Sequence, residues 1–126
     1  MIRLITWSEV DEAIAKMPKP ICDGFYPIPR GGLCIALMLS HRFGKPILDR
    51  PTHLSILVDD IADSGKTLQK IRLRHPYPAY VLAKRYNCRE KAITFGILIE
   101  NDDWLVFPWE NKEKAEEDYA NYLSRQ

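Results

Sequence analysis

The chain has 126 residues, of which 46% are hydrophobic and 28% are charged, and its formal net charge is +1. This length and composition predict one globular domain, residues 1–126, with a substantial core. The balance of acidic and basic side chains argues against a nucleic-acid partner, and no apolar run is long enough to predict a membrane span. The N-terminal segment lacks the layout of a secretion signal, and three cysteines without metal-site spacing favour a reducing cytoplasm.

The order of the predicted strands and helices indicates an α/β fold. Apolar runs bounded by turn residues predict strands at residues 24–28, 55–58, 80–83, 94–99 and 105–107. Helices are expected from an N-cap at Ser8 to a stop before Pro18, and then at residues 32–43, 65–74 and 111–124. The last of these carries Ala115, Tyr119 and Tyr122 on one stripe.

Strands that alternate with helices predict three layers, in which helices flank a mainly parallel central sheet. Ligands of such sheets bind beyond the carboxyl ends of the strands. The candidate site is therefore formed by the segments after Ile28, Val58 and Ala83.

Two adjacent carboxylates, Asp59 and Asp60, follow the strand predicted at residues 55–58. Paired acids at a strand end are costly unless a cation or hydroxyl groups meet them, and these two could clasp a diol and its Mg²⁺ from two sides. The following turn, Asp63 to Thr67, opens a helix and suits a phosphate dianion. A P-loop would need glycine at the position of Asp60 and is rejected. The alternative is a solvated loop with surface acids.

Arg30, Gly31 and Gly32 join the first predicted strand of the sheet to an apolar helix. Two glycines allow a close approach of the backbone to a ligand, and the guanidinium offers a planar donor fork for phosphate oxygens. Because glycine pairs also mark ordinary turns, the position of this loop upstream of the acid pair is what gives it weight.

The segment from Ile56 to Leu68 resembles the phosphoribosyl pyrophosphate (PRPP) motif of type I phosphoribosyltransferases: apolar residues, two acids, two small or apolar residues, then an Asp–hydroxyl–Gly–X–Thr turn. The resemblance implies a PRPP site made of Asp59, Asp60, Ala62, Asp63, Ser64, Gly65, Lys66 and Thr67. It further implies that Asp59 and Asp60 hold the ribose hydroxyls with Mg²⁺. Arg30 and Gly31 would bind pyrophosphate, and Arg30 and Asp63 would be catalytic, with Asp63 facing the purine N7.

Further along the chain, Lys84 follows an apolar strand, and residues 102–110 supply two indoles and a Pro-Trp-acid ending. These features resemble the xanthine-guanine and hypoxanthine-guanine branch of the family. The resemblance implies that Lys84 donates to a purine 6-oxo group, that Trp104 stacks on the base, and that Leu105 presents backbone groups to it. The alternatives are a rim position for Lys84 and a core position for Trp104.

The implied reaction converts a 6-oxo purine (guanine, xanthine or hypoxanthine) and PRPP into a nucleoside monophosphate and pyrophosphate. Relatives usually carry a long mobile loop between the helix after Gly32 and the acid-pair strand, but residues 45–54 are short and contain two prolines. We therefore expect a minimal form with a reduced hood, slow turnover or competing hydrolysis of PRPP. The rivals are a catalytically inactive PRPP or nucleotide sensor of the same fold, and a structural domain whose acids serve a partner. A homodimer is compatible with the tyrosines of the last helix.

Overall fold

The computed structural model describes residues 1–125. Its elements in chain order are β1 (Ile2–Leu4), α1 (Trp7–Lys16), β2 (Gly24–Pro27), α2 (Gly32–Phe43), β3 (Ser55–Ala62), α3 (Lys66–Arg72), β4 (Ala79–Arg85), β5 (Ile93–Ile99), β6 (Trp104–Val106) and α4 (Lys112–Ser124). A four-stranded sheet has the order β2-β3-β4-β5, and β1 pairs with β6 in a separate two-stranded sheet. Every pair in both sheets is parallel. The predicted α/β fold with a parallel sheet is confirmed.

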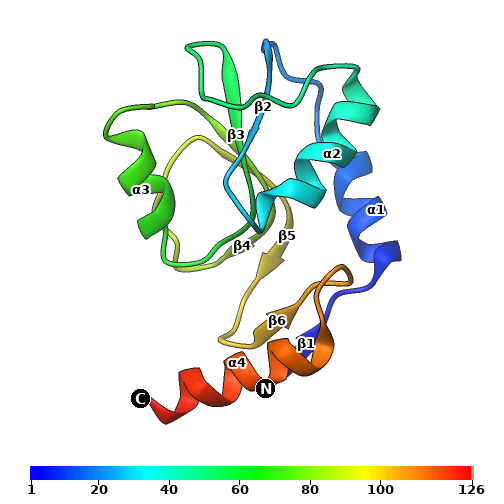
Figure 1. Ribbon diagram of the computed structural model, residues 1–126, viewed down its shortest axis with the longest axis vertical. Helices are drawn as coiled ribbons and strands as arrows, with labels where there is room; N and C mark the ends of the chain where they lie inside the picture. Colours follow the sequence, from blue (N-terminus) through cyan, green and yellow to red (C-terminus); the bar gives the residue numbers. More distant parts are fainter. Residues whose placement is uncertain (126) are drawn as a thin grey trace.

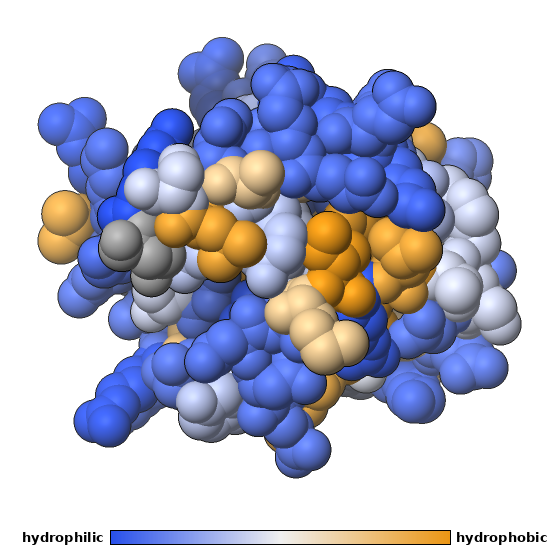
Figure 2. Space-filling view, turned by 90° about the horizontal axis from the view of Figure 1, so that it is seen from below, coloured by the Kyte–Doolittle hydropathy of each residue, from blue (hydrophilic) through white to orange (hydrophobic). Residues whose placement is uncertain are grey.

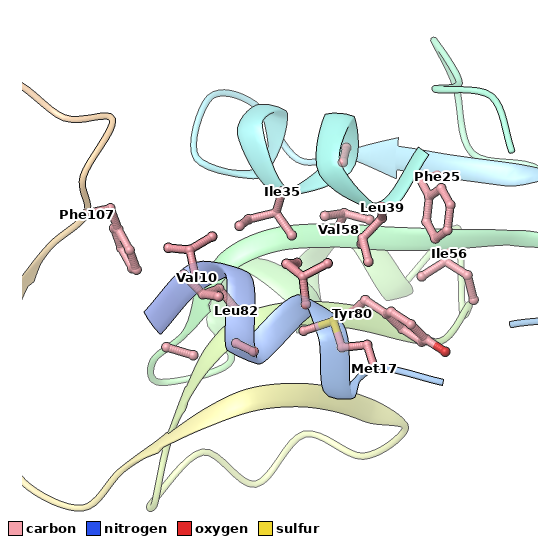
Figure 3. Close-up of a cluster of buried hydrophobic side chains, with 14 of the residues drawn as sticks. Val10, Met17, Phe25, Ile35, Leu39, Ile56, Val58, Tyr80, Leu82 and Phe107 are labelled. Atoms are coloured by element: carbon pink, nitrogen blue, oxygen red, sulfur yellow. The ribbon is translucent and has the colours of Figure 1, made fainter. Parts of the chain in front are cut away.

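The four-stranded sheet is the middle of three layers (Figure 1). Helices α1 and α2 cover one face, and α3 covers the other. Figure 3 shows the larger of the two cores, in which side chains of both helices meet those of the sheet: Val10, Met17, Phe25, Ile35, Leu39, Ile56, Val58, Tyr80, Leu82 and Phe107. On the opposite face, Leu68 of α3 packs against Leu57 and Val81. Because strands buried on both faces have no polar side, the runs in β3 and β4 are continuously apolar.

Helix α1 begins two residues earlier than the sequence predicted. Its N-cap is Thr6, not Ser8: the Thr6 hydroxyl accepts from the Glu9 amide at 3.1 Å, and the Glu9 carboxylate accepts from the Thr6 amide at 3.2 Å. This reciprocal pair of hydrogen bonds satisfies two backbone amides at the start of the helix. With Thr6 as the N-cap, Ser8 lies inside the helix and cannot be its cap. Arg3 adds a bond of 2.9 Å to the same carboxylate.

The ends of β2 and β3 do not coincide, and this mismatch creates the candidate site. β2 ends at Pro27, opposite Val58, whereas β4 stays paired with β3 as far as Ala62. Beyond Val58, β3 therefore has a neighbour only on the β4 side. On the other side the chain turns at Ile28, whose amide donates to the Val58 carbonyl at 2.7 Å, and enters α2. The predicted strand at residues 55–58 is thus four residues longer in the structure.

The two-stranded β1–β6 sheet and α4 form one end of the molecule, which also holds both chain ends (Figure 1). The predicted stripe of α4 packs here: Ala115 is buried, and the rings of Tyr119 and Tyr122 lie 5.5 and 5.3 Å from Trp104. Figure 2 views this end and shows apolar side chains bordered by hydrophilic ones. Among the helices of residues 1–125, none is long and apolar enough to cross a membrane.

Candidate functional site

Three cavities adjoin the carboxyl end of β3, and Asp60 borders all of them. The first, of about 430 Å³, lies between the Arg30–Gly31 loop and the start of α4. The second, of about 210 Å³, is lined by residues 59–68. The third, of about 180 Å³, is lined among others by Asp63, Trp104 and Leu105. The structure therefore brings the predicted acid pair, turn, glycine loop and indole around one carboxylate.

The sequence analysis placed the two acids after the strand, but in the structure they lie inside β3. They do so because β4 extends far enough to pair with this part of the strand. The Asp60 amide donates to Asp59 Oδ1 at 2.9 Å, and the Ile61 amide donates to Asp60 Oδ1 at 2.7 Å. Burial, followed by the charge of Asp60, raises the pKa of Asp59 to about 8. The pair therefore resists full ionisation until a cation or a set of hydroxyl groups meets it.

The acid pair is suited to a magnesium ion that arrives with a phosphorylated ligand. Within residues 1–125, no three His, Cys, Asp or Glu side chains gather into a metal site made by the protein alone. Mg²⁺ commonly takes one or two protein carboxylates and completes its shell with water and substrate phosphates. Asp59 and Asp60 supply that number, and a cation beside them would offset both the burial and the charge of Asp60 that raise the pKa of Asp59.

The turn between β3 and α3 requires glycine at one position. Gly65 has φ +88°, a left-handed conformation that other residues rarely adopt, and a Cβ at this position would lie 2.8 Å from Glu90 and 3.1 Å from the Cys88 sulfur. Ser64 Oγ accepts from the Lys66 amide at 3.3 Å, which ties the turn together. The sharp reversal lets residues 59–68 wrap a single small cavity.

The glycine loop lies directly against the acid pair. A Cβ on Gly31 would stand 2.7 Å from Asp60 Oδ1, so only glycine permits the carboxylate and the loop backbone to approach this closely. Gly32 lies in the same way against the backbone of Val58. Arg30 is exposed and lines the same 430 Å³ cavity as Gly31 and Asp60.

Lys84 is the predicted site residue that the structure does not bring into these cavities. It pairs with Ala62 in the sheet, at the expected edge, but its ammonium lies over the Phe95 ring, 5.4 Å from the ring centre. The cation that lines the 180 Å³ cavity is the next residue, Arg85, which the sequence analysis did not single out. β4 extends two residues past the predicted strand end, so Arg85 follows Lys84 within the strand.

Arg85 connects the turn between β3 and α3 to the loop that precedes β6. Its side chain is only 8% exposed, and Nε donates to Asp63 at 3.0 Å. Its Nη1 donates to the carbonyls of Asn101 and Asp103 at 2.9 and 2.8 Å. These contacts fix the position of Asp63 and of the chain that leads to Trp104. The sequence signal for a cation at this cavity was a basic residue after an apolar run. The sequence analysis assigned that signal to Lys84, whereas the residue that lines the cavity is Arg85.

Trp104 packs against side chains of α4 and also remains accessible from a cavity. Trp104 is half-buried, contacts two tyrosines of α4, and still lines the 180 Å³ cavity, whereas Leu105 is 8% exposed. Glu110, also not singled out in advance as a site residue, borders this cavity and the 430 Å³ one and accepts from the Phe107 amide at 2.8 Å. Burial, with the charges of Asp60 and Asp118, raises the pKa of Glu110.

No protein-family model matches the chain. Over 57 residues, 44% of the chain, it is 39% identical to a xanthine-guanine phosphoribosyltransferase of Roseobacter denitrificans, and this covers 32% of that protein. Over 60 residues it is 38% identical to the enzyme of the same name from Cereibacter sphaeroides, covering 35% of it. The matched part thus spans about a third of the length of these curated relatives.

Solved structures resemble the chain over most of its length. A purine phosphoribosyltransferase from Pyrococcus horikoshii superposes with a TM-score of 0.69 and 24% identity, covering 87% of this chain and 94% of the other. A xanthine-guanine-hypoxanthine phosphoribosyltransferase from Helicobacter pylori gives 0.64 and 18%, covering 94% and 99%. A Neisseria gonorrhoeae protein with bound ppGpp gives 0.66 and 18%, covering 94% of each chain. These matches confirm the predicted fold, and the curated relatives confirm the resemblance stated from the sequence.

Proposed function

We propose that this chain, which has the type I phosphoribosyltransferase fold, transfers phosphoribose from PRPP to a 6-oxo purine and releases pyrophosphate. The observation that carries the proposal is the position of Asp60 at the junction of three cavities. The 5′-phosphate, the pyrophosphate and the base each need a compartment around one ribose, which keeps its 5′-phosphate while the base replaces the pyrophosphate at C1′. A carboxylate at the junction is suited to the ribose hydroxyls.

In this proposal the ligand spans the three compartments. The 5′-phosphate takes the turn at residues 62–67, and the ribose hydroxyls meet Asp59 and Asp60. Pyrophosphate lies in the 430 Å³ cavity beside Arg30 and Gly31. The purine enters the 180 Å³ cavity, where Trp104 supplies an aromatic face and Leu105 backbone groups. Stacking of a base on an aromatic side chain contributes roughly 1–3 kcal/mol.

The chemical step forms a bond between a purine ring nitrogen and C1′ of the ribose and breaks the bond from C1′ to the pyrophosphate oxygen, which leaves with the electron pair. Positive charge develops on the sugar and negative charge on the leaving group, where the guanidinium of Arg30 stabilises it. Mg²⁺, held by Asp59, Asp60 and ligand oxygens, would supply further stabilisation of that negative charge. Asp63 is the proposed acceptor of the purine proton, and Arg85 holds it in place at 3.0 Å.

A 6-oxo purine is proposed from the resemblance of Lys84 to the lysine that contacts a purine 6-oxo group in the xanthine-guanine branch, because an ammonium group is a donor only. Lys84 pairs with Ala62 in the sheet and its ammonium lies over Phe95, outside the three cavities, so the proposal requires its flexible stem to turn toward the carbonyl oxygen of the base. The 6-amino group of adenine would offer it no acceptor.

The test is a transfer assay with labelled guanine, hypoxanthine, xanthine and adenine, each incubated with PRPP and MgCl₂. We expect monophosphate from the oxo purines and little from adenine. Asp60→Asn should abolish most of the transfer, whereas Asp49→Asn, at an exposed carboxylate that lines none of the three cavities, should leave it unchanged. Absence of product from all four bases, together with retained binding of GMP, would exclude the transferase.

A second candidate function is nucleotide or PRPP binding without turnover. Residues 45–54 form no helix or strand, and their one sheet-like contact is an isolated bridge between Ile47 and Phe25. These residues line none of the three cavities, so they do not cover the site in the way that a closing loop excludes water during catalysis. The Neisseria gonorrhoeae protein carries bound ppGpp, which supports the idea that this fold serves as a nucleotide receptor. Calorimetric binding of GMP or PRPP without product formation would favour this candidate.

A further inference from the structure

We propose that Lys114, in the first turn of α4, is a second pyrophosphate-binding cation that acts opposite Arg30. This inference rests on the proposed function and adds to it a residue and an element that the sequence motifs do not contain. Lys114 and Arg30 are the two basic side chains that line the 430 Å³ cavity among the described residues. They come from opposite walls, one from α4 and the other from the loop before α2.

A second cation is required for pyrophosphate binding because the other charged side chains that line the cavity are acidic. Asp60, Glu110 and Asp118 all border it. Asp60 lies against Gly31, on the Arg30 side of the cavity. A pyrophosphate group held by Arg30 alone would therefore face an acidic wall of Glu110 and Asp118 on the α4 side, and like charges brought together are unfavourable. Lys114 is placed on that wall, so it can neutralise the side of the anion that Arg30 does not reach.

Helix α4 holds Lys114 at a fixed place. The Lys114 amide is itself the capped group of the helix, since it donates to the Asn111 side chain at 2.9 Å. The next residue, Ala115, is buried, and further along the helix Tyr119 and Tyr122 pack on the Trp104 ring. The backbone of the first turn is thereby fixed against β6, while the lysine side chain extends from it.

The ammonium of Lys114 is available to a ligand. It is 63% exposed, and its present partners are Glu117 at 3.7 Å and Asp118 at 3.6 Å on the same helix. Exposed pairs of this kind are weak and easily exchanged. A multiply charged pyrophosphate offers a stronger partner, to which the flexible side chain can turn.

The experiment compares Lys114→Gln with Lys112→Gln, a matched control on the same helix. Lys112 is also 63% exposed and also pairs with a glutamate one turn away, but it does not line the cavity. Pyrophosphate with MgCl₂, and separately GMP, is titrated calorimetrically into each variant. We expect Lys114→Gln to weaken pyrophosphate binding about tenfold, and to leave GMP binding, which uses the turn at residues 62–67, unchanged. Lys112→Gln should alter neither, and Lys114→Arg should restore most of the pyrophosphate affinity.

Two outcomes would overturn the inference, and they are distinguishable. If the wild-type protein binds both ligands and the two glutamine variants bind pyrophosphate equally, the role of Lys114 is wrong while the proposed function stands. If the wild-type protein binds neither ligand, the proposed function fails and the role of Lys114 fails with it.

Discussion

The buried guanidinium of Arg85 holds the exposed carboxylate of Asp63 at 3.0 Å, and with the same side chain it binds two backbone carbonyls of the loop before β6. One residue of β4 thus fixes both the turn proposed for the 5′-phosphate and the approach to the proposed base compartment. A side chain with donors in a rigid fork is suited to three acceptors in fixed directions.

Arg85→Gln should therefore destabilise the protein more than Asp63→Asn. Loss of the guanidinium leaves the carbonyls of Asn101 and Asp103 without their donor, which should lower the free energy of unfolding by about 2–3 kcal/mol. Asp63 is 62% exposed, so its change to Asn should alter stability by less than about 0.5 kcal/mol. Urea unfolding of both variants measures the difference. Equal stabilities would mean that Arg85 does not organise this loop.

The raised pKa of Asp59 predicts a stability that depends on pH. Burial and the charge of Asp60 raise this pKa to about 8, whereas an aspartate in an unfolded chain titrates near ~3.9. Between about pH 4 and pH 8 the folded protein therefore holds a proton that the unfolded chain releases. The free energy of unfolding should fall as the pH rises through this window, by at most about 1.4 kcal/mol per pH unit.

The measurement is urea unfolding at several pH values for the wild-type protein, Asp59→Asn and, as a control, Asp49→Asn. Asparagine cannot ionise, so Asp59→Asn should remove much of the slope and should exceed the wild-type stability most clearly near pH 8. The exposed Asp49 should leave the slope unchanged. Parallel profiles for all three proteins would show that Asp59 ionises normally in the fold.

The sequence predicted the layers, and the grouping of most candidate site residues, because these depend on local patterns. Apolar runs, the acid pair and the Gly65 turn are each contained in a few neighbouring residues, and the helix at 32–43 has the bounds that its pattern indicated. The stripe of the last helix was also read correctly: Ala115 is buried, and both tyrosines pack on Trp104.

The features that were missed depend on partners distant in sequence. β1 is three residues long and pairs with β6, about a hundred residues away, so no local pattern reveals it. β3 and β4 extend past their apolar runs because they pair with each other, which moved the acid pair into the strand and Arg85 to the cavity. The true cap of α1 competed with an equally plausible Ser8, and only the reciprocal bonds of Thr6 and Glu9 distinguish them.

The two neighbouring glycines before α2 should respond differently to alanine. In Gly31→Ala the new methyl group meets the Asp60 carboxylate, a side chain that can move aside, so stability should change little while pyrophosphate and GMP bind more weakly. In Gly32→Ala the methyl group meets the backbone of β3, with the Val58 carbonyl carbon 2.9 Å away. Because backbone cannot yield so easily, we expect a loss of about 1–3 kcal/mol of stability. Thermal unfolding measures the effect on stability, and calorimetry measures the effect on binding. Unchanged affinity of the Gly31→Ala protein for both ligands would show that this loop does not contact them.

Lys84→Met tests whether the lysine over Phe95 serves the base or only the fold. Methionine keeps an unbranched stem of similar length against the ring but removes the ammonium, so stability should change by less than about 1 kcal/mol. If the ammonium turns to the purine 6-oxo group, affinity for GMP should fall about tenfold, while the weaker affinity for AMP should not fall. Calorimetric titration of both nucleotides measures the ratio, with the exposed Lys19→Met as the matched control. An unchanged ratio of GMP to AMP affinity in Lys84→Met would assign the selection of the base to another residue, and the buried Arg85 at the same sheet edge would then be the next to test.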